Sequence, residues 1–214
     1  MMTNDEICDK LHHIFKNLTR YQFPFNESLI PNNGIYVLFE KGEKAHGDCE
    51  RIVRIGTHTG KGNLGQRLNE HFLNEHNDRS IFRKNIGRAL LNKRQDPLLE
   101  LWNIDLTTRV HRLQYATPTN RMALSKIEKE VSTVIRESFK FCVLQVDDMQ
   151  YRMELEGLLI ATVNQCAVCS PSDTWLGNYS PVAKIKASGL WLVQKLNGCT
   201  MSTIDLSKME QMIR

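Results

Sequence analysis

The segment that decides the fold runs from residue 34 to residue 56 and reads GIYVLFEKGEKAHGDCERIVRIG. Residues 35–40 and 51–55 are rich in the β-branched and aromatic side chains that favour strands. Between them, residues 41–49 are polar and contain glycine, which is typical of a hairpin loop. The segment therefore predicts two adjacent strands joined by a loop.

Helical patterns surround this hairpin. Apolar residues recur every three or four positions with polar residues between them, which indicates amphipathic helices. The segments with this pattern are residues 5–18, 64–74, 79–94 and 121–138, and a further helix that begins after Asp148. A third strand is expected at residues 139–146. The order of elements predicts an α+β fold, with a small antiparallel or mixed three-stranded sheet flanked by helices.

The composition is that of a globular protein. The chain has 214 residues, of which 41% are hydrophobic and 24% charged, and this suits one elaborated domain. A net charge of +4 and a pI near 8.7 permit an anionic partner without demanding one. No apolar run is long enough for a transmembrane helix, and the acidic start lacks the apolar core of a signal peptide. We therefore expect a cytoplasmic protein with no membrane partner.

The cysteines are expected to be reduced thiols, because the cytoplasm disfavours disulfides. Cys166 and Cys169 form a C-x-x-C pair, which is half of a possible zinc site. No second pair of this kind accompanies it, and the adjacent His12 and His13 do not complete it. The sequence therefore predicts buried thiols here rather than a metal centre.

Residues suited to phosphodiester chemistry lie at the hairpin and in the helix after it. Gly34-Ile35-Tyr36 begins the first predicted strand, and Arg54-Ile55-Gly56 ends the second. Arg67 and His71 are four residues apart, so a helix would place them on the same face. A phenol, cations and backbone that permits close approach are groups that phosphodiester hydrolysis can use.

These motifs resemble those of the GIY-YIG nuclease family. Gly34-Ile35-Tyr36 matches the first family motif, and Arg54-Ile55-Gly56 matches the second except that arginine replaces tyrosine. The resemblance implies that the catalytic residues are Tyr36, Arg54, Arg67, His71 and Asn178, and that Glu156 holds one Mg²⁺ (or Mn²⁺) ion. It also implies a GIY-YIG-like nuclease domain over residues 34–180 with a basic helical insertion at about 78–138, a helical extension at 1–33 and a packed tail at 181–214.

The implied residues have chemistry that suits these roles. The guanidinium of Arg67 is always charged and its planar fork matches a phosphate. A phenol such as that of Tyr36 accepts a proton at neutral pH only when nearby cations stabilise the phenolate. His71 would relay that proton or bind the phosphate directly. Two interpretations of Arg54 stay open, because its side chain could bind phosphate or could point away.

The strongest predicted nucleic-acid surface is the basic segment at residues 79–94. Its six cations follow one another without an acid and surround an apolar stripe, which is typical of a helix that faces a phosphate backbone. These cations are Arg79, Arg83, Lys84, Arg88, Lys93 and Arg94. The glycine-rich loop at residues 56–65 is expected to be flexible and to add His58 and Lys61 as contacts.

The predicted function is that of a metal-dependent endonuclease that hydrolyses DNA phosphodiesters, with a restriction or defence role as the first hypothesis. Duplex DNA is the expected partner, RNA stays open as a substrate, and the protein would act as a monomer or homodimer. One alternative is a nucleic-acid-binding protein that keeps the fold and has lost cleavage, which the arginine at position 54 favours. Another is a helical regulator whose basic helix reads DNA.

Overall fold

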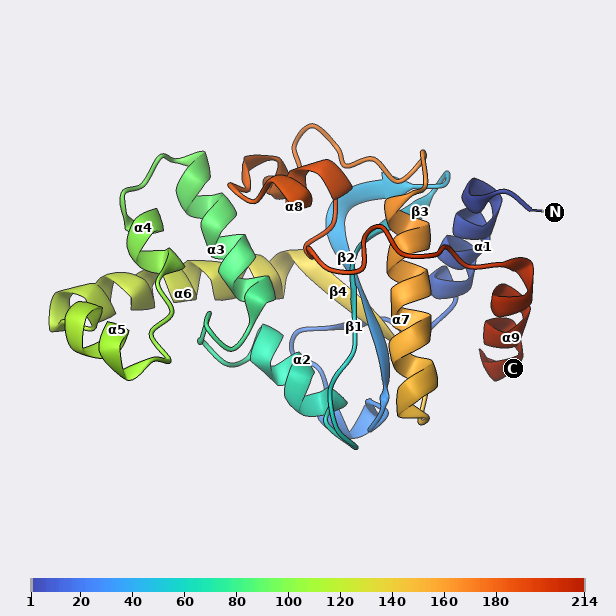
Figure 1. Cartoon of the computed structure of the whole chain (residues 1–214), viewed down its shortest axis with the longest axis horizontal. Coiled ribbons are helices and arrows are strands. Elements are labelled where there is room, and N and C mark those ends of the chain that lie inside the picture. The colour runs from blue at the N-terminus through green and yellow to red at the C-terminus, as the bar shows by residue number, and fades with distance from the viewer. Residues whose placement is uncertain (1, 214) are drawn as a thin grey trace.

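The computed structural model describes residues 2–213, which form one sheet between two layers of helices (Figure 1). The strands pair in the order β1–β4–β2–β3, and every pairing is antiparallel. Their bounds are Tyr21–Gln22 for β1, Gly34–Ala45 for β2, Cys49–Gly56 for β3 and Phe139–Gln145 for β4. The predicted α+β class is confirmed, but the sheet has four strands rather than three.

Two local features of the sheet differ from the prediction. Strand β1 contains two residues, which is too short for a periodic pattern to mark it. Strand β2 continues to Ala45, so most of the predicted hairpin loop is strand, and Lys44 and Ala45 pair with Glu50 and Cys49. The turn between β2 and β3 therefore contains only residues 46–48, where His46 adopts a φ of 48°.

Side chains of β2 alternate between two cores. Ile35, Val37 and Phe39 pack in one core, and Tyr36 and Leu38 pack in the other. Because both faces of the strand are buried, its sequence is apolar throughout rather than alternating. This explains why the GIYVLF run carried a clear strand signal.

Helices cover both faces of the sheet (Figure 1). The first core lies beneath α1 (Asn4–Lys16), α7 (Met149–Asn164) and α9 (Thr203–Ile213). The second lies beneath α2 (Leu64–Phe72), α3 (Ile81–Lys93) and α6 (Pro118–Ser138). The remaining elements are α4 (Leu98–Asn103), α5 (Arg109–Tyr115), α8 (Ala183–Ser188), η1 (Glu27–Leu29) and η2 (Leu176–Tyr179). Among residues 2–213, none of the helices has both the length and the apolar character needed to cross a bilayer.

Local capping sets the start of two helices that matter below. Thr3 and Glu6 form a reciprocal capping box at the start of α1, in which each side chain accepts from the other residue's backbone N–H. The side chain of Asp148 accepts from Tyr151 N at 2.6 Å, which confirms the predicted start of α7. These caps mark the starts of the helices that carry Cys8 (α1) and Glu156 (α7).

The C-terminal part of the chain covers the edge of β3. The backbone N–H of Trp191 donates to Val53 O at 2.7 Å, and the ring of Trp191 lies 5.0 Å from that of Trp175. Both indole N–H groups donate to the buried carboxylate of Glu40 at 2.8 Å. Burial raises the pKa of Glu40 to about 7. These contacts hold residues 192–195 beside β3, where they form one wall of a cavity.

Candidate active site

A cavity of about 280 Å³ lies where β2, β3, α2, α3 and α7 meet the C-terminal segment. Its walls include five of the residues that the sequence singled out, namely Tyr36, Arg54, His58, Arg67 and Glu156. They come from segments up to 120 positions apart in the chain, since Tyr36 lies on β2 and Glu156 on α7. The fold therefore brings a phenol, two guanidinium groups, an imidazole and a carboxylate to one hollow.

Tyr36 is connected to a buried hydrogen-bond chain. Its hydroxyl lies 2.8 Å from His71 Nε2, and His71 Nδ1 lies 2.8 Å from Ser80 Oγ. Burial, followed by three nearby guanidinium groups, lowers the pKa of His71 well below its ordinary value. A neutral His71 can accept the hydroxyl proton at Nε2 while its Nδ1–H donates to Ser80. In this arrangement, the lone pairs of the Tyr36 oxygen are left for the cavity.

The burial of His71 decides between the two roles predicted for it. Its side chain is fully buried behind Tyr36 and is not part of the cavity wall. Its position therefore favours the role in which His71 contacts the Tyr36 hydroxyl over the role in which it binds the phosphate directly.

The glycines of both motifs permit close approaches that a side chain would block. A Cβ added at Gly56 would lie 2.3 Å from Tyr36 Oη. A Cβ added at Gly34 would lie 2.5 Å from Leu144 O on the neighbouring strand. Real Cβ atoms do not approach so closely, so glycine at these positions keeps the Tyr36 hydroxyl in place and β2 against β4.

Two arginines line the cavity with different partners. Arg67 donates to Glu70 Oε2 at 2.8 Å and to Arg79 O at 3.3 Å. Burial acts to lower the pKa of Arg67, but the nearby oxygens of Tyr36 and Glu70 raise it above its ordinary value. Arg67 therefore stays charged beside the phenol.

Arg54, which stands at the position of the second family tyrosine, also lines the cavity. One terminal nitrogen donates to the carbonyl of Trp191, and the guanidinium lies 5.3 Å from the centroid of the Phe82 ring. Its Nε is buried and has no hydrogen-bond partner among the described residues. Of the two interpretations left open, the structure favours a cation in the wall over a side chain that points away.

His58 closes the cavity near the start of β2. Gly34 N donates to its Nε2 at 3.4 Å, and its Nδ1 is buried without a partner in the described part of the chain. Burial, followed by the charge of Arg152, lowers the pKa of His58. The loop that carries His58 is tied down rather than free, because Gly62 N donates to Asn33 Oδ1 at 2.8 Å and Thr57 Oγ1 donates to Gly34 O at 2.8 Å.

Glu156 lines the cavity but is already paired with a cation. Lys195 Nζ lies 2.5 Å from Glu156 Oε2 and also donates to Met153 O at 3.0 Å. One carboxylate completed by waters is a donor set that Mg²⁺ or Mn²⁺ accepts. Glu156 therefore fits one such ion, provided that the Lys195 ammonium moves aside.

Comparison with known proteins agrees with this geometry. A family model described as GIY-YIG domain matches residues 3–214. The chain belongs to the GIY-YIG domain family. The match spans the whole fold from α1 to α9, and it supports a nuclease-type phosphodiester hydrolase in general terms. No curated protein and no solved structure matches the chain at a significant level.

One residue that the GIY-YIG resemblance implied lies elsewhere. Asn178 is in η2 and is not part of the cavity wall. Its amide donates to Ser172 O at 2.9 Å and to Asp173 O at 3.2 Å, so it fixes the preceding loop. The prediction matched a short tetrapeptide, and such a match carries little positional information. Asn85 on α3 is the asparagine that lines the cavity, and no pattern along the chain pointed to it.

The predicted nucleic-acid surface of the GIY-YIG protein also needs correction at two cations. Arg83 is fully buried and donates to Glu128 Oε2 at 2.7 Å, to Glu128 O at 3.1 Å and to Ser132 Oγ at 2.8 Å. Lys84 is buried and lies 2.6 Å from Asp78 Oδ1. The partner of Arg83 is Glu128, 45 residues away, and the partner of Lys84 is Asp78, just before α3. Neither acid interrupts the run of cations, so the sequence predicted an exposed surface although these two side chains are buried.

The other predicted cations differ in exposure. Lys61 and Arg79 are exposed. Lys61 is two residues after Thr59, which lines the cavity, and Arg79 O accepts from Arg67, which lines it as well. Arg88 is half-buried and donates to Asn103 and Asn85. Lys93 and Arg94 lie at the far end of α3, where Lys93 is 4.8 Å from the Tyr179 ring centroid and Arg94 pairs with Asp96 and Glu130.

Proposed function

We propose that this GIY-YIG protein is an endonuclease that hydrolyses DNA phosphodiesters in the cavity around Tyr36. The observation that carries the proposal is the joint presence of Tyr36, Arg67 and Glu156 in the wall of one cavity. Each alone would be an ordinary residue. Together they provide a proton acceptor, a fixed cation for a phosphate oxygen and a carboxylate for a divalent ion.

In the proposed reaction, the arginines orient the substrate and the phenol handles the proton. Arg67 and Arg54 hold non-bridging oxygens of the scissile phosphate. Tyr36 acts as a phenolate stabilised by Arg67 and Arg54, and its Oη takes a proton from the attacking water. The water oxygen bonds to phosphorus as the bond to the leaving sugar oxygen breaks, and solvent protonates that oxygen. The Tyr36 hydroxyl formed in this step donates to His71 Nε2, 2.8 Å away. A Mg²⁺ or Mn²⁺ ion bound to Glu156 would supply Lewis-acid stabilisation of the developing charge.

His71 acts mainly by positioning in this scheme. Burial and the surrounding guanidinium groups disfavour its charged form, so it is a poor place to store a proton. Its neutral ring instead keeps the Tyr36 proton turned away from the substrate. Ser80 Oγ holds the ring by its other nitrogen at 2.8 Å.

We propose duplex DNA as the substrate, bound through its backbone. The exposed cations Lys61 and Arg79 are near residues of the cavity wall, Lys61 in sequence to Thr59 and Arg79 through its contact with Arg67, so they would contact phosphates next to the scissile one. The helices from α3 to α6 form an insertion that gives the domain further surface for DNA. A nuclease domain that binds DNA through its own surface, without a separate DNA-binding domain, would suit a restriction or defence enzyme.

A second candidate function is nucleic-acid binding without cleavage. The ion pair between Lys195 and Glu156, at 2.5 Å, favours it because the ammonium occupies the carboxylate that a metal would need. The arginine at position 54 favours it as well, because a second phenol is absent from the cavity wall.

Nicking of supercoiled plasmid with and without Mg²⁺ separates the two functions. The wild type is expected to convert supercoiled to open-circular DNA only with Mg²⁺, and Glu156→Gln is expected to lose this activity. Glu154→Gln is the matched control, because Glu154 is exposed on the same helix. A wild type that binds DNA but leaves duplex, single-stranded and branched DNA intact would contradict the nuclease and support the binding protein. Cleavage of RNA alone would contradict the substrate assignment.

A further inference from the structure

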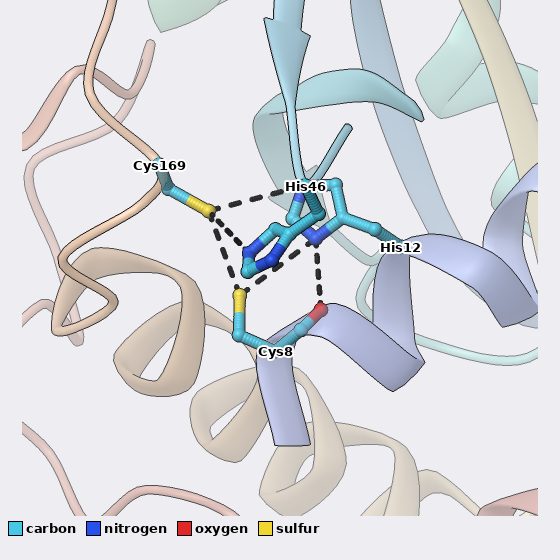
Figure 2. Close-up of side chains that lie close together, drawn as sticks. All are labelled: Cys8, His12, His46 and Cys169. Carbon is cyan, nitrogen blue, oxygen red and sulfur yellow. Dashed lines mark hydrogen bonds between the residues drawn. The ribbon is translucent and has the colours of Figure 1, made fainter. Parts of the chain in front are cut away.

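A second group of chemically reactive side chains lies away from the cavity. Cys8 and His12 lie one turn apart on α1, His46 is in the β2–β3 turn, and Cys169 follows α7 (Figure 2). All four are buried, and their ligand atoms lie within 4.8 Å of one another. We propose that these residues bind one structural Zn²⁺ ion.

The separations of the ligand atoms fit a tetrahedron around zinc. Bonds of about 2.3 Å to sulfur and about 2.0 Å to nitrogen give edges of about 3.8 Å between sulfurs and about 3.5 Å between sulfur and nitrogen. Cys8 Sγ and Cys169 Sγ are 3.5 Å apart, and Cys169 Sγ is 3.5 Å from His46 Nε2 and 3.9 Å from His12 Nε2. These three separations are close to the tetrahedral edges, and all four ligand atoms lie within 4.8 Å of one another, so small side-chain movements would bring them to bonding distance from one ion.

The far nitrogen of each imidazole has a partner that turns the near nitrogen toward the proposed ion. His12 Nδ1 lies 2.9 Å from Cys8 O, so Nδ1–H donates to the carbonyl and the lone pair is on Nε2. Ile52 N donates weakly to this Nε2 at 3.4 Å, and zinc would replace that contact. His46 Nδ1 lies 3.4 Å from the carboxylate of Asp9, and its Nε2 faces the sulfurs (Figure 2). Such outer partners are typical of histidines that bind zinc.

A disulfide and a metal-free thiol cluster both fit this geometry less well than zinc does. A disulfide requires sulfurs about 2.05 Å apart, whereas those of Cys8 and Cys169 are 3.5 Å apart and both thiols are free. A cluster of neutral buried thiols would not require two imidazole nitrogens to converge on the same point. Two thiolates and two neutral imidazoles, in contrast, balance the charge of Zn²⁺, so the loaded site is neutral in its buried position.

The proposed role is structural, because four protein ligands leave no open position for a substrate. The ion would join three segments: α1, the hairpin turn and the segment after α7. Cys8 and Cys169 belong to the core opposite that of Tyr36, so the site is separate from the cavity. Cys166 and Cys169 are buried free thiols, as the sequence predicted. The proposed zinc site goes beyond that expectation, because the partners of Cys169 come from two distant segments.

Cys166 is an alternative ligand, and the test must distinguish it from the proposed ligands Cys8 and Cys169. Its Sγ lies 3.3 Å from His46 Nε2, nearer than Cys169 Sγ at 3.5 Å, but Cys166 is not one of the four residues whose ligand atoms all lie within 4.8 Å of one another. We expect Cys166→Ser to keep the metal, and Cys8→Ser and Cys169→Ser to lose it. Cys199→Ser is the matched control, because this thiol is exposed and remote from the cluster.

Zinc content of the protein purified without chelators tests the proposal directly. Elemental analysis is expected to find about one zinc ion per chain, and chelation in Mg²⁺-free buffer is expected to lower Tm by about 10 °C or more. If the serine variants do not fold, cobalt replacement in the wild type is the second measurement. Tetrahedral cobalt with thiolate-to-metal charge transfer supports the site.

Two results would overturn the proposal. The first is a zinc content below about one tenth per chain that does not rise after incubation with zinc. The second is loss of zinc in Cys166→Ser with retention in Cys169→Ser, which would overturn the ligand assignment. Neither measurement uses DNA cleavage, so the outcome is independent of the proposed nuclease function.

Discussion

Replacing Lys195 by methionine is expected to increase the affinity of the cavity for Mn²⁺. In the wild type, a divalent ion at Glu156 must displace the ammonium from Glu156 Oε2, at 2.5 Å, and from Met153 O, at 3.0 Å. The side chains of Lys195 and Glu156 are 33% and 13% exposed, so solvent weakens this ion pair without abolishing it. Methionine keeps the packing of the aliphatic stem and removes the competing charge.

The size of the effect follows from the strength of the contact that is lost. A charge-assisted pair of this exposure contributes about 1–2 kcal/mol. Removing it should therefore tighten Mn²⁺ binding by about 5- to 30-fold. Calorimetric titration of zinc-saturated protein measures this Kd, because the proposed zinc site is then filled.

Matched variants make the result specific. Lys186→Met removes an exposed charge of the same sign and is expected to leave Mn²⁺ affinity unchanged. Glu156→Gln is expected to abolish binding even in the Lys195→Met background. Mn²⁺ affinity that falls, or changes by less than about twofold, in Lys195→Met would refute the view that the ammonium competes with the metal.

Three further predictions concern the groups that hold the site in place. Arg83→Met should lower the free energy of unfolding, measured by urea titration, by about 3–5 kcal/mol, because it leaves Glu128 buried without its partner. The double variant Arg83→Met with Glu128→Met should recover most of this loss. Equal losses in the single and double variants would contradict the pairing. Burial raises the pKa of Glu40 from 4.5 to about 7 in the folded protein. Between these pH values the folded state holds a proton on Glu40 that the unfolded state has lost, so the free energy of unfolding falls as pH rises through this range. Glu40→Gln should therefore gain up to about 3 kcal/mol at pH 8 and almost nothing below pH 4.5, measured by urea midpoints. Gly56→Ala should fold but lose nicking, because its Cβ would meet Tyr36 Oη at 2.3 Å; full activity would show that the hydroxyl can move.

Much of the fold could be predicted because its elements carry their own signals. The apolar run of β2 and β3 and the spacing of α1, α3 and α6 mark strands and helices locally. Strand β1 has two residues and takes its conformation from pairing with β4, which is a tertiary contact. Local pattern therefore identifies long elements and misses those that depend on distant partners.

In the candidate site, too, the sequence alone identified residues within a short continuous motif and missed contacts between distant residues. Motif order brought Tyr36 and Arg67 to attention because both lie in a short continuous unit. Whether Arg83 faces solvent depended on Glu128, 45 residues away, which no local window contains. The pairing of Lys195 with Glu156 carried no signal along the chain either, because it depends on the packing of the C-terminal segment on β3.

The cysteine and histidine cluster is a further case. The spacing of Cys8 and His12, four residues apart on a helix, was the one signal that could have suggested a partner for Cys169. His46 enters the cluster from a hairpin turn whose position only the folded sheet defines.

We infer that the Tyr36 hydroxyl takes part in the chemical step and not in DNA binding. Tyr36→Phe removes that oxygen and leaves the ring, so single-turnover nicking and DNA affinity in Ca²⁺ should be measured side by side below the melting temperature. We predict a cleavage rate lower by about 10²- to 10⁴-fold with a Kd changed by less than about twofold. A phenylalanine variant that cleaves at the wild-type rate, or that loses affinity as much as rate, would contradict the account.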